Sequence, residues 1–158
     1  MFSGSNWAAS DKKIFADVGI AEDYANVVKD CPASLTFICY PTPCGGLKAH
    51  KDIVLATVLF ITKPGLEVYI NNVGWQAVKP NPGYVVLNLG NALELMTGGR
   101  YYSALHRVCE SDDERLSIVS FIYPKPTMPL INYTNGQQLY VNFNEFFKEQ
   151  IKIVYPGA

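Results

Sequence analysis

The chain has 158 residues, of which 49% are hydrophobic and 17% are charged, and its formal net charge is −1. This size and composition predict a single folded domain with a substantial core, and they exclude a disordered chain. The small net charge argues against a nucleic-acid surface built on positive charge, and no apolar run reaches the roughly 18 residues that a membrane helix needs.

The N-terminus and the cysteines indicate the compartment that we expect. No basic segment followed by an apolar stretch comes after Met1, so the predicted location is cytoplasmic. Four cysteines without paired CxxC spacing are expected to be free thiols in a reducing compartment: Cys31, Cys39, Cys44 and Cys109. Neither a nucleic acid nor a membrane is expected as a partner.

Residues 1–33 form the first predicted unit, a short helical or irregular segment. Four apolar side chains recur there with the spacing of one helix face: Ile20, Tyr24, Val27 and Val28. This pattern indicates a short amphipathic helix that packs on a sheet. Pro32 is expected to end that helix.

Residues 34–158 form the second predicted unit, and short strands dominate it. Strands are expected at residues 34–40, 53–61, 66–70, 75–78, 84–89, 105–108 and 115–123. Residues 53–61 are almost wholly apolar, as in a strand that is buried on both faces. Turns rich in proline, glycine and asparagine separate these strands.

Two helices complete the prediction for this unit. Asn91 is expected to cap a short helix over residues 92–97, and Asn142 with Glu145 forms a capping box for a helix near the end of the chain. Residues 125–140 have the composition of a loop. Many short strands with few helices predict a mainly β sandwich or small barrel with flanking helices.

The only two histidines direct attention to a candidate metal site. His50 and Asp52 are two residues apart at the start of a predicted strand, so their side chains point to one side. They provide two of the three ligands of the two-histidine, one-carboxylate Fe(II) site, and His106 on another predicted strand could provide the third. The alternative for so common a tripeptide is a surface histidine beside a solvated aspartate.

A second pair, Arg115 and Ser117, shares one face of a later predicted strand. A guanidinium beside a hydroxyl can bind a carboxylate, because arginine offers a planar two-pronged donor and serine adds another. The alternative is a strand-end arginine that pairs with Glu114 or another acid on the surface.

The order of motifs resembles that of a known family. The motifs are His50-x-Asp52, Pro64-Gly65-Leu66, Pro82-Gly83-Tyr84, Gly99-Arg100-Tyr101 before His106, and Arg115-x-Ser117. Over residues 35–124 the chain resembles the Fe(II)/2-oxoglutarate-dependent oxygenases of the isopenicillin N synthase-like branch. The resemblance implies a mainly β fold, the double-stranded β-helix or jelly-roll barrel, with a few flanking helices.

The resemblance also implies a site and an activity. Its metal ligands would be His50, Asp52 and His106, and its cosubstrate residues Arg115, Ser117 and Tyr40. Its cofactors would be Fe(II), 2-oxoglutarate as cosubstrate and O2, with ascorbate as an optional reductant. The implied enzyme is a dioxygenase of specialised metabolism that hydroxylates a C–H bond of a small molecule while 2-oxoglutarate is decarboxylated to succinate and CO2.

Two alternatives stay open at this point. One is an Fe(II)-dependent oxidase that uses no 2-oxoglutarate, since isopenicillin N synthase and the ethylene-forming oxidase resemble this chain in the same motifs. The other is a truncated, catalytically silent barrel that acts as a binding module.

Four features depart from the family pattern. Lys51 replaces a common threonine and is expected to point away from the metal, Ile38 replaces an asparagine, and Asn91 replaces an aspartate. The region before the first strand is also short for the family. We therefore expect an uncovered apolar face, which favours self-association or a partner.

Overall fold

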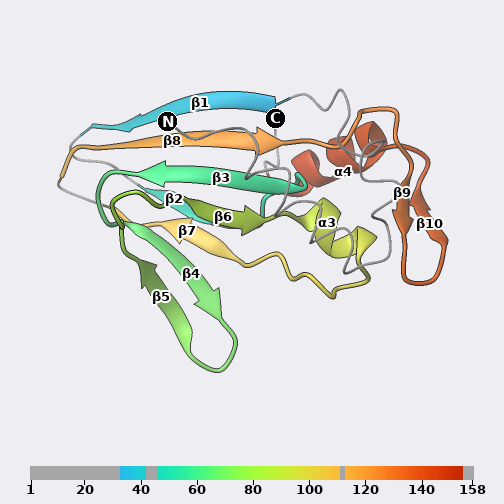
Figure 1. Cartoon of the computed structure of the whole chain (residues 1–158), viewed down its shortest axis with the longest axis horizontal. Helices are drawn as coiled ribbons and strands as arrows, with labels where there is room; N and C mark the ends of the chain where they lie inside the picture. The colour runs from blue at the N-terminus through green and yellow to red at the C-terminus, as the bar shows by residue number, and fades with distance from the viewer. Residues whose placement is uncertain (1–32, 42–45, 111–112, 155–158) are drawn as a thin grey trace.

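The computed structural model describes residues 33–41, 46–110 and 113–154, and these are mainly β, as predicted (Figure 1). All of the predicted first unit except Ala33, including its helix, lies outside the described residues, so the division into two units stays a prediction. Among the described residues, no helix is long and apolar enough to cross a membrane.

The larger sheet has four antiparallel strands. Their spatial order is β1 (Ala33–Tyr40), β8 (Arg115–Ile122), β3 (Ala56–Ile61) and β6 (Val86–Leu89). Strand β8 lies between β1 and β3, with Tyr40 opposite Arg115 on one side and Ile61 opposite Ser117 on the other. This register brings side chains from three strands to one inner face.

A second four-stranded antiparallel sheet completes the barrel. Its order is β2 (Leu47–His50), β7 (His106–Val108), β4 (Leu66–Ile70) and β5 (Gly74–Val78). The β4–β5 hairpin forms where it was predicted, and Asn72 adopts the positive φ of 66° that its tight turn requires. Side chains of both sheets line one cavity between them, as expected of a jelly-roll barrel.

The main apolar core lies at one end of the barrel rather than inside it. Helix α3 (Asn91–Met96), helix α4 (Phe143–Val154) and the hairpin of β9 (Leu130–Asn132) and β10 (Gln137–Tyr140) gather there (Figure 1). The buried residues of this core are Ile53, Leu55, Ala92, Leu93, Met96, Leu130, Phe143 and Phe146. The barrel interior instead holds a cavity that both apolar side chains and the polar residues described below line.

Three local predictions were wrong. Residues 53–55 bend into the core between the helices, so the strand begins only at Ala56; Phe60 is 44% exposed, so that strand is not buried on both faces. Residues 125–140 contain the β9–β10 hairpin instead of a plain loop. Asn91 is the first residue of α3 and no cap, because its amide donates to Gln150 Oε1 at 3.4 Å and Gly90 occupies the cap position.

Two further predictions are confirmed. The backbone N–H of Glu145 donates to Asn142 Oδ1 at 2.9 Å, so Asn142 caps α4. Cys39 and Cys109 are free thiols. Cys31 and Cys44 lie outside the described residues.

Candidate functional site

His50, Asp52 and His106 meet at the end of the second sheet. The two histidines are direct cross-strand partners in β2 and β7, and Asp52 follows two residues after His50. The Nε2 atoms of His50 and His106 lie 3.8 and 3.7 Å from Asp52 Oδ1. One potential ligand atom from each residue lies within 4.8 Å of the others, so all three can reach one ion.

Both imidazoles are oriented by backbone carbonyls. His50 Nδ1 lies 2.8 Å from Lys48 O, and His106 Nδ1 lies 3.1 Å from Ala104 O. A carbonyl only accepts a hydrogen bond, so each Nδ1 carries the proton and each Nε2 presents its lone pair to the centre of the triad. This is the tautomer that binds a metal through Nε2.

Burial favours the neutral form of His106. Its side chain is buried, and desolvation lowers the pKa of the imidazole below its ordinary value. The neighbouring His50 lowers that pKa further, while the carboxylate of Asp52 and the hydrogen bond to Ala104 O oppose the shift. The neutral imidazole is the form that acts as a ligand.

The carboxylate of Asp52 fits a bound cation. Asp52 is buried, and its Oδ2 atom has no hydrogen-bond partner. The distances from Oδ1 to the two imidazoles are too long for hydrogen bonds. A buried anion without hydrogen bonds is costly unless a cation offsets it, so the donor set suits a divalent metal.

The segment that carries the triad is tied to α3. The backbone N–H of Asn91 donates to Asp52 O at 2.7 Å, and Lys51 Nζ lies 2.8 Å from Glu94 Oε2. Glu94 Oε2 also accepts the backbone N–H of Ser103 at 3.2 Å. Lys51 thus points away from the triad, as predicted, and joins the loop to the helix.

Arg115 lies buried on the other side of the triad. Its Nη1 donates to Pro64 O at 3.2 Å, its Nη2 donates to Cys109 O at 3.3 Å, and its guanidinium covers the ring of Tyr40 at 4.3 Å. The described part of the chain places no carboxylate in an ion pair with it. The predicted alternative of a surface pair with Glu114 is therefore wrong, because the arginine is only 6% exposed and its partners are carbonyls.

A cavity of about 60 Å³ joins these two groups. Its lining includes all six residues to which the resemblance gives a role: His50, Asp52, His106, Arg115, Ser117 and Tyr40. Three buried polar atoms of its lining have no hydrogen-bond partner: Asp52 Oδ2, Arg115 Nε and Thr57 Oγ1. Unsatisfied buried groups gathered at one cavity indicate a polar ligand.

Thr57 is a site residue that the sequence reasoning missed. It is 1% exposed on the inner face of β3, in register with Phe121 of β8. The signal was present, since threonine is the one hydroxyl residue in an otherwise apolar run. It was overlooked because that run was interpreted as a strand buried on both faces.

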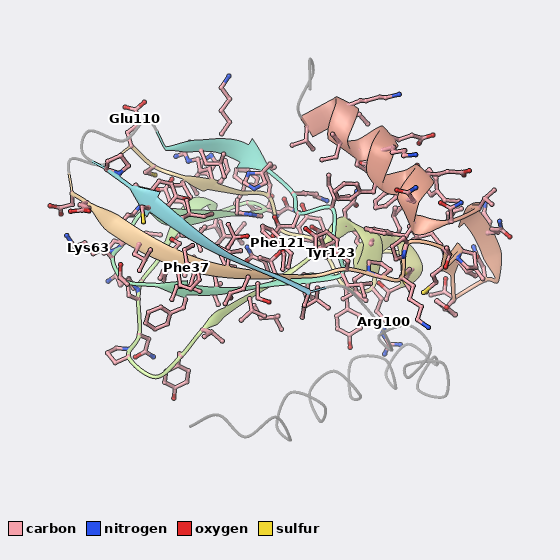
Figure 2. All side chains as sticks on the ribbon, turned by 90° about the horizontal axis from the view of Figure 1, so that it is seen from above. Phe37, Lys63, Arg100, Glu110, Phe121 and Tyr123 are labelled. Atoms are coloured by element: carbon pink, nitrogen blue, oxygen red, sulfur yellow. The ribbon has the colours of Figure 1, made fainter. Side chains whose placement is uncertain are left out.

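A second, larger cavity of about 410 Å³ lies beside His50 and Asp52. It shares six lining residues with the first cavity, His50 and Asp52 among them, and the two cavities therefore adjoin at these residues. Its remaining walls come from β1, from residues 46–54, from the end of β8 and from α4. Figure 2 shows Phe121 and Tyr123, two of these wall residues, near the middle of the molecule between the strands and α4.

Comparisons by sequence agree with this site. Residues 32–124 match the family model described as the 2OG-Fe(II) oxygenase superfamily. Leucoanthocyanidin dioxygenase 1 of Oryza sativa subsp. indica is 42% identical over 88 residues, which cover 54% of this chain and 23% of that protein. Protein DMR6-LIKE OXYGENASE 1 of Arabidopsis thaliana is 31% identical over 142 residues, which cover 80% of this chain and 40% of that protein. The chain thus spans less than half the length of either relative.

Comparison with solved structures agrees with the fold. A full-length protein of Neurospora crassa, solved in complex with alpha-KG and thymine, matches with a TM-score of 0.79 at 20% identity. The match covers 92% of this chain and 51% of that one. At this identity the likeness concerns the fold alone, and it confirms the predicted double-stranded β-helix.

Proposed function

Because this chain belongs to the 2OG-Fe(II) oxygenase superfamily, we propose that it is an Fe(II)- and 2-oxoglutarate-dependent dioxygenase that hydroxylates a C–H bond of a small molecule. One observation carries the proposal. A buried carboxylate between two imidazoles and a buried guanidinium without a carboxylate partner among the described residues line the same cavity.

His50, Asp52 and His106 would hold Fe(II) through two Nε2 atoms and a carboxylate oxygen. Two neutral ligands and one anion leave the site positively charged, which favours an anionic cosubstrate beside it. When bound there, Fe(II) with 2-oxoglutarate and O2 supplies the oxidation of an unactivated C–H bond, and the cosubstrate leaves as succinate and CO2.

Arg115, Ser117 and Tyr40 would bind the far carboxylate of 2-oxoglutarate. The buried charge of Arg115 lacks a carboxylate among the described residues, so a ligand carboxylate would satisfy it. Pro64 O and Cys109 O fix the guanidinium, and the ring of Tyr40 supports it from one side. The group is therefore oriented before the ligand arrives, which lowers the entropic cost of binding.

The apolar part of the cavity would keep water from the reacting groups. Leu59 and Ile61 of β3 and Leu66 of β4 line the cavity that the triad and the arginine share. Excluding water strengthens the electrostatic contacts of the bound carboxylate and limits side reactions.

The proposed substrate is a small organic molecule of specialised metabolism. The solved Neurospora crassa structure holds thymine, and one relative is a leucoanthocyanidin dioxygenase. Both names support a small molecule, rather than a macromolecule, as the substrate of this chain.

The test measures succinate released from 2-oxoglutarate by the purified chain with Fe(II) and O2. We expect slow release without a primary substrate and its loss in His106→Ala and Arg115→Leu. Arg107→Leu is the matched control, because Arg107 lies in β7 near the site but pairs with Glu67 at 2.7 Å outside the cavity.

The other outcomes identify the alternatives. Oxygen consumption that requires Fe(II) and a substrate but forms no succinate would favour an oxidase. A chain that takes up neither Mn(II) nor 2-oxoglutarate at one equivalent would be a silent barrel, and the proposal would be rejected.

A further inference from the structure

The larger cavity has the size of a small-molecule site. Its volume of about 410 Å³ lies in the range of roughly 300–1,000 Å³ that is typical of ligand pockets. His50 and Asp52 form one wall, and three residues of α4 face the space from another: Phe147, Ile151 and Val154. A molecule bound there would lie beside the metal ligands.

A row of aromatic rings forms a further wall. The ring centroids of Phe121 and Tyr123 are 6.3 Å apart, and those of Tyr123 and Phe147 are 6.2 Å apart. Such a row presents apolar ring faces and edges over several ångströms. Another ring packs well against it in a stacked or edge-on arrangement.

The charges of the lining disfavour an acidic ligand. Apart from the triad, Lys51 is the only charged side chain among the described residues that line this cavity. Its ammonium lies 2.8 Å from Glu94 and 4.5 Å from the centre of the Tyr102 ring, so its charge is already paired. Among the described lining residues a ligand carboxylate would find no unpaired cationic side chain, and burying it without one is costly.

We propose that this cavity binds a neutral, ring-containing small molecule, and that Ile151 and Val154 of α4 set the size and charge that it accepts. The inference rests on the proposed function, since it concerns the primary substrate of that same site. It adds a chemical class and two specificity-determining residues that act through direct contact with the ligand.

The first test compares 2-naphthol with 2-naphthoate, which have the same ring system and differ in charge. Binding is measured by calorimetry on the protein loaded with Mn(II) and 2-oxoglutarate without O2. We expect 2-naphthol to bind at least about tenfold more tightly, because Asp52 and bound 2-oxoglutarate already offset the charge of Mn(II), and the described lining residues leave no unpaired cationic side chain for the anion. Equal or tighter binding of 2-naphthoate would overturn the inference.

The second test uses two isoleucines of one helix. Ile151 lines the cavity, whereas Ile153 is 71% exposed. Ile151→Trp should fill the space and lower the affinity for 2-naphthol by about tenfold or more. Ile153→Trp should leave that affinity unchanged. Equal affinities in the two variants would contradict the role given to α4.

The third test compares two arginine variants. It tests the effect of charge and does not depend on filling the cavity. Val154→Arg should reverse the preference toward 2-naphthoate, and Ile153→Arg should not change it. Uptake of Mn(II) and of 2-oxoglutarate by the wild type is measured alongside. Failure of either uptake counts against the proposed function, whereas normal uptake without the expected preference counts against this inference alone.

Discussion

Gly65 lies directly against the guanidinium of Arg115, and a Cβ atom at position 65 would overlap Nη1 of that arginine. Its φ of +134° is also a conformation that residues with a side chain rarely adopt. Because Pro64 O accepts a hydrogen bond from the same Nη1, the loop before β4 both fixes the guanidinium and leaves room for it.

We predict that Gly65→Ala weakens 2-oxoglutarate binding at least about tenfold, because the added methyl group displaces the guanidinium from its position. Gly74→Ala is the matched control: Gly74 also has a positive φ, of 91°, but nothing lies within 4 Å of the place that an added methyl group would take. The affinity for 2-oxoglutarate is measured on Mn(II)-loaded protein. Equal losses in both variants would mean that backbone strain, and not the arginine, is responsible.

The hydroxyl of Thr57 is predicted to bind the ligand and to lower the stability of the ligand-free protein. It is buried without a partner, so Thr57→Val should raise the free energy of unfolding of the ligand-free protein by about 1 kcal/mol. The same change should lower the affinity for 2-oxoglutarate severalfold, because a hydrogen-bond donor that faces the cavity is lost. Denaturant unfolding and ligand titration measure the two effects.

Thr62→Val is the control for that prediction. The Thr62 hydroxyl donates to Leu116 O at 2.9 Å and accepts from Leu116 N at 3.2 Å, and it lies outside the cavity. This variant should lose stability and keep its affinity for 2-oxoglutarate. A Thr57→Val protein that keeps its affinity in the same way would show that its hydroxyl has no part in ligand binding.

The metal triad predicts stabilisation by metal. Mn(II) at a hundred times its dissociation constant should raise the free energy of unfolding by about 2.7 kcal/mol, since it binds the folded chain alone. Asp52→Ala should abolish this gain, because the only anionic ligand of the triad is removed. Asp113→Ala, which changes an exposed carboxylate outside the site, should retain it. A gain that survives in Asp52→Ala would place the metal elsewhere.

The sequence allowed the candidate site to be predicted because its residues form pairs that are two apart in the chain. Arg115 and Ser117 lie in β8, where this spacing places both on one side. The prediction that His50 and Asp52 begin a strand was wrong, since β2 ends at His50 and Asp52 lies in the loop after it, but the short spacing still keeps the two side chains together. His106 was a candidate third ligand because it is the only other histidine, and the resemblance supported it; the spacing could not place it beside His50, since pairing of β2 with β7 spans more than fifty residues.

The contacts that the sequence could not predict are those between distant segments. Nothing near Gly65 indicates that Arg115 will pass beside it, fifty residues later in the chain. Residues 53–55 look like a strand because apolar strands and core-forming bends have the same composition. Only their packing against α3 distinguishes the two.

The last prediction concerns the thiol of Cys109, whose backbone carbonyl holds Arg115. Burial raises the pKa of this thiol above its ordinary value, and its hydrogen bond to the Glu67 carboxylate raises it further. Glu67→Gln removes that anion and leaves Arg107, whose charge lowers the pKa. The fraction of thiolate at pH 8 therefore rises, and alkylation of Cys109 should become faster, because the thiolate is the reactive form.

The rate is measured by peptide mass spectrometry in a Cys31→Ser, Cys44→Ser background, in which Cys39 is the internal reference. Cys39 is exposed on β1, away from Glu67, so its rate should not change. An unchanged ratio of the Cys109 and Cys39 rates would show that access of the reagent, and not the carboxylate, limits the reaction. A larger ratio would show that Glu67 keeps the thiol protonated beside the carbonyl that holds the proposed cosubstrate arginine.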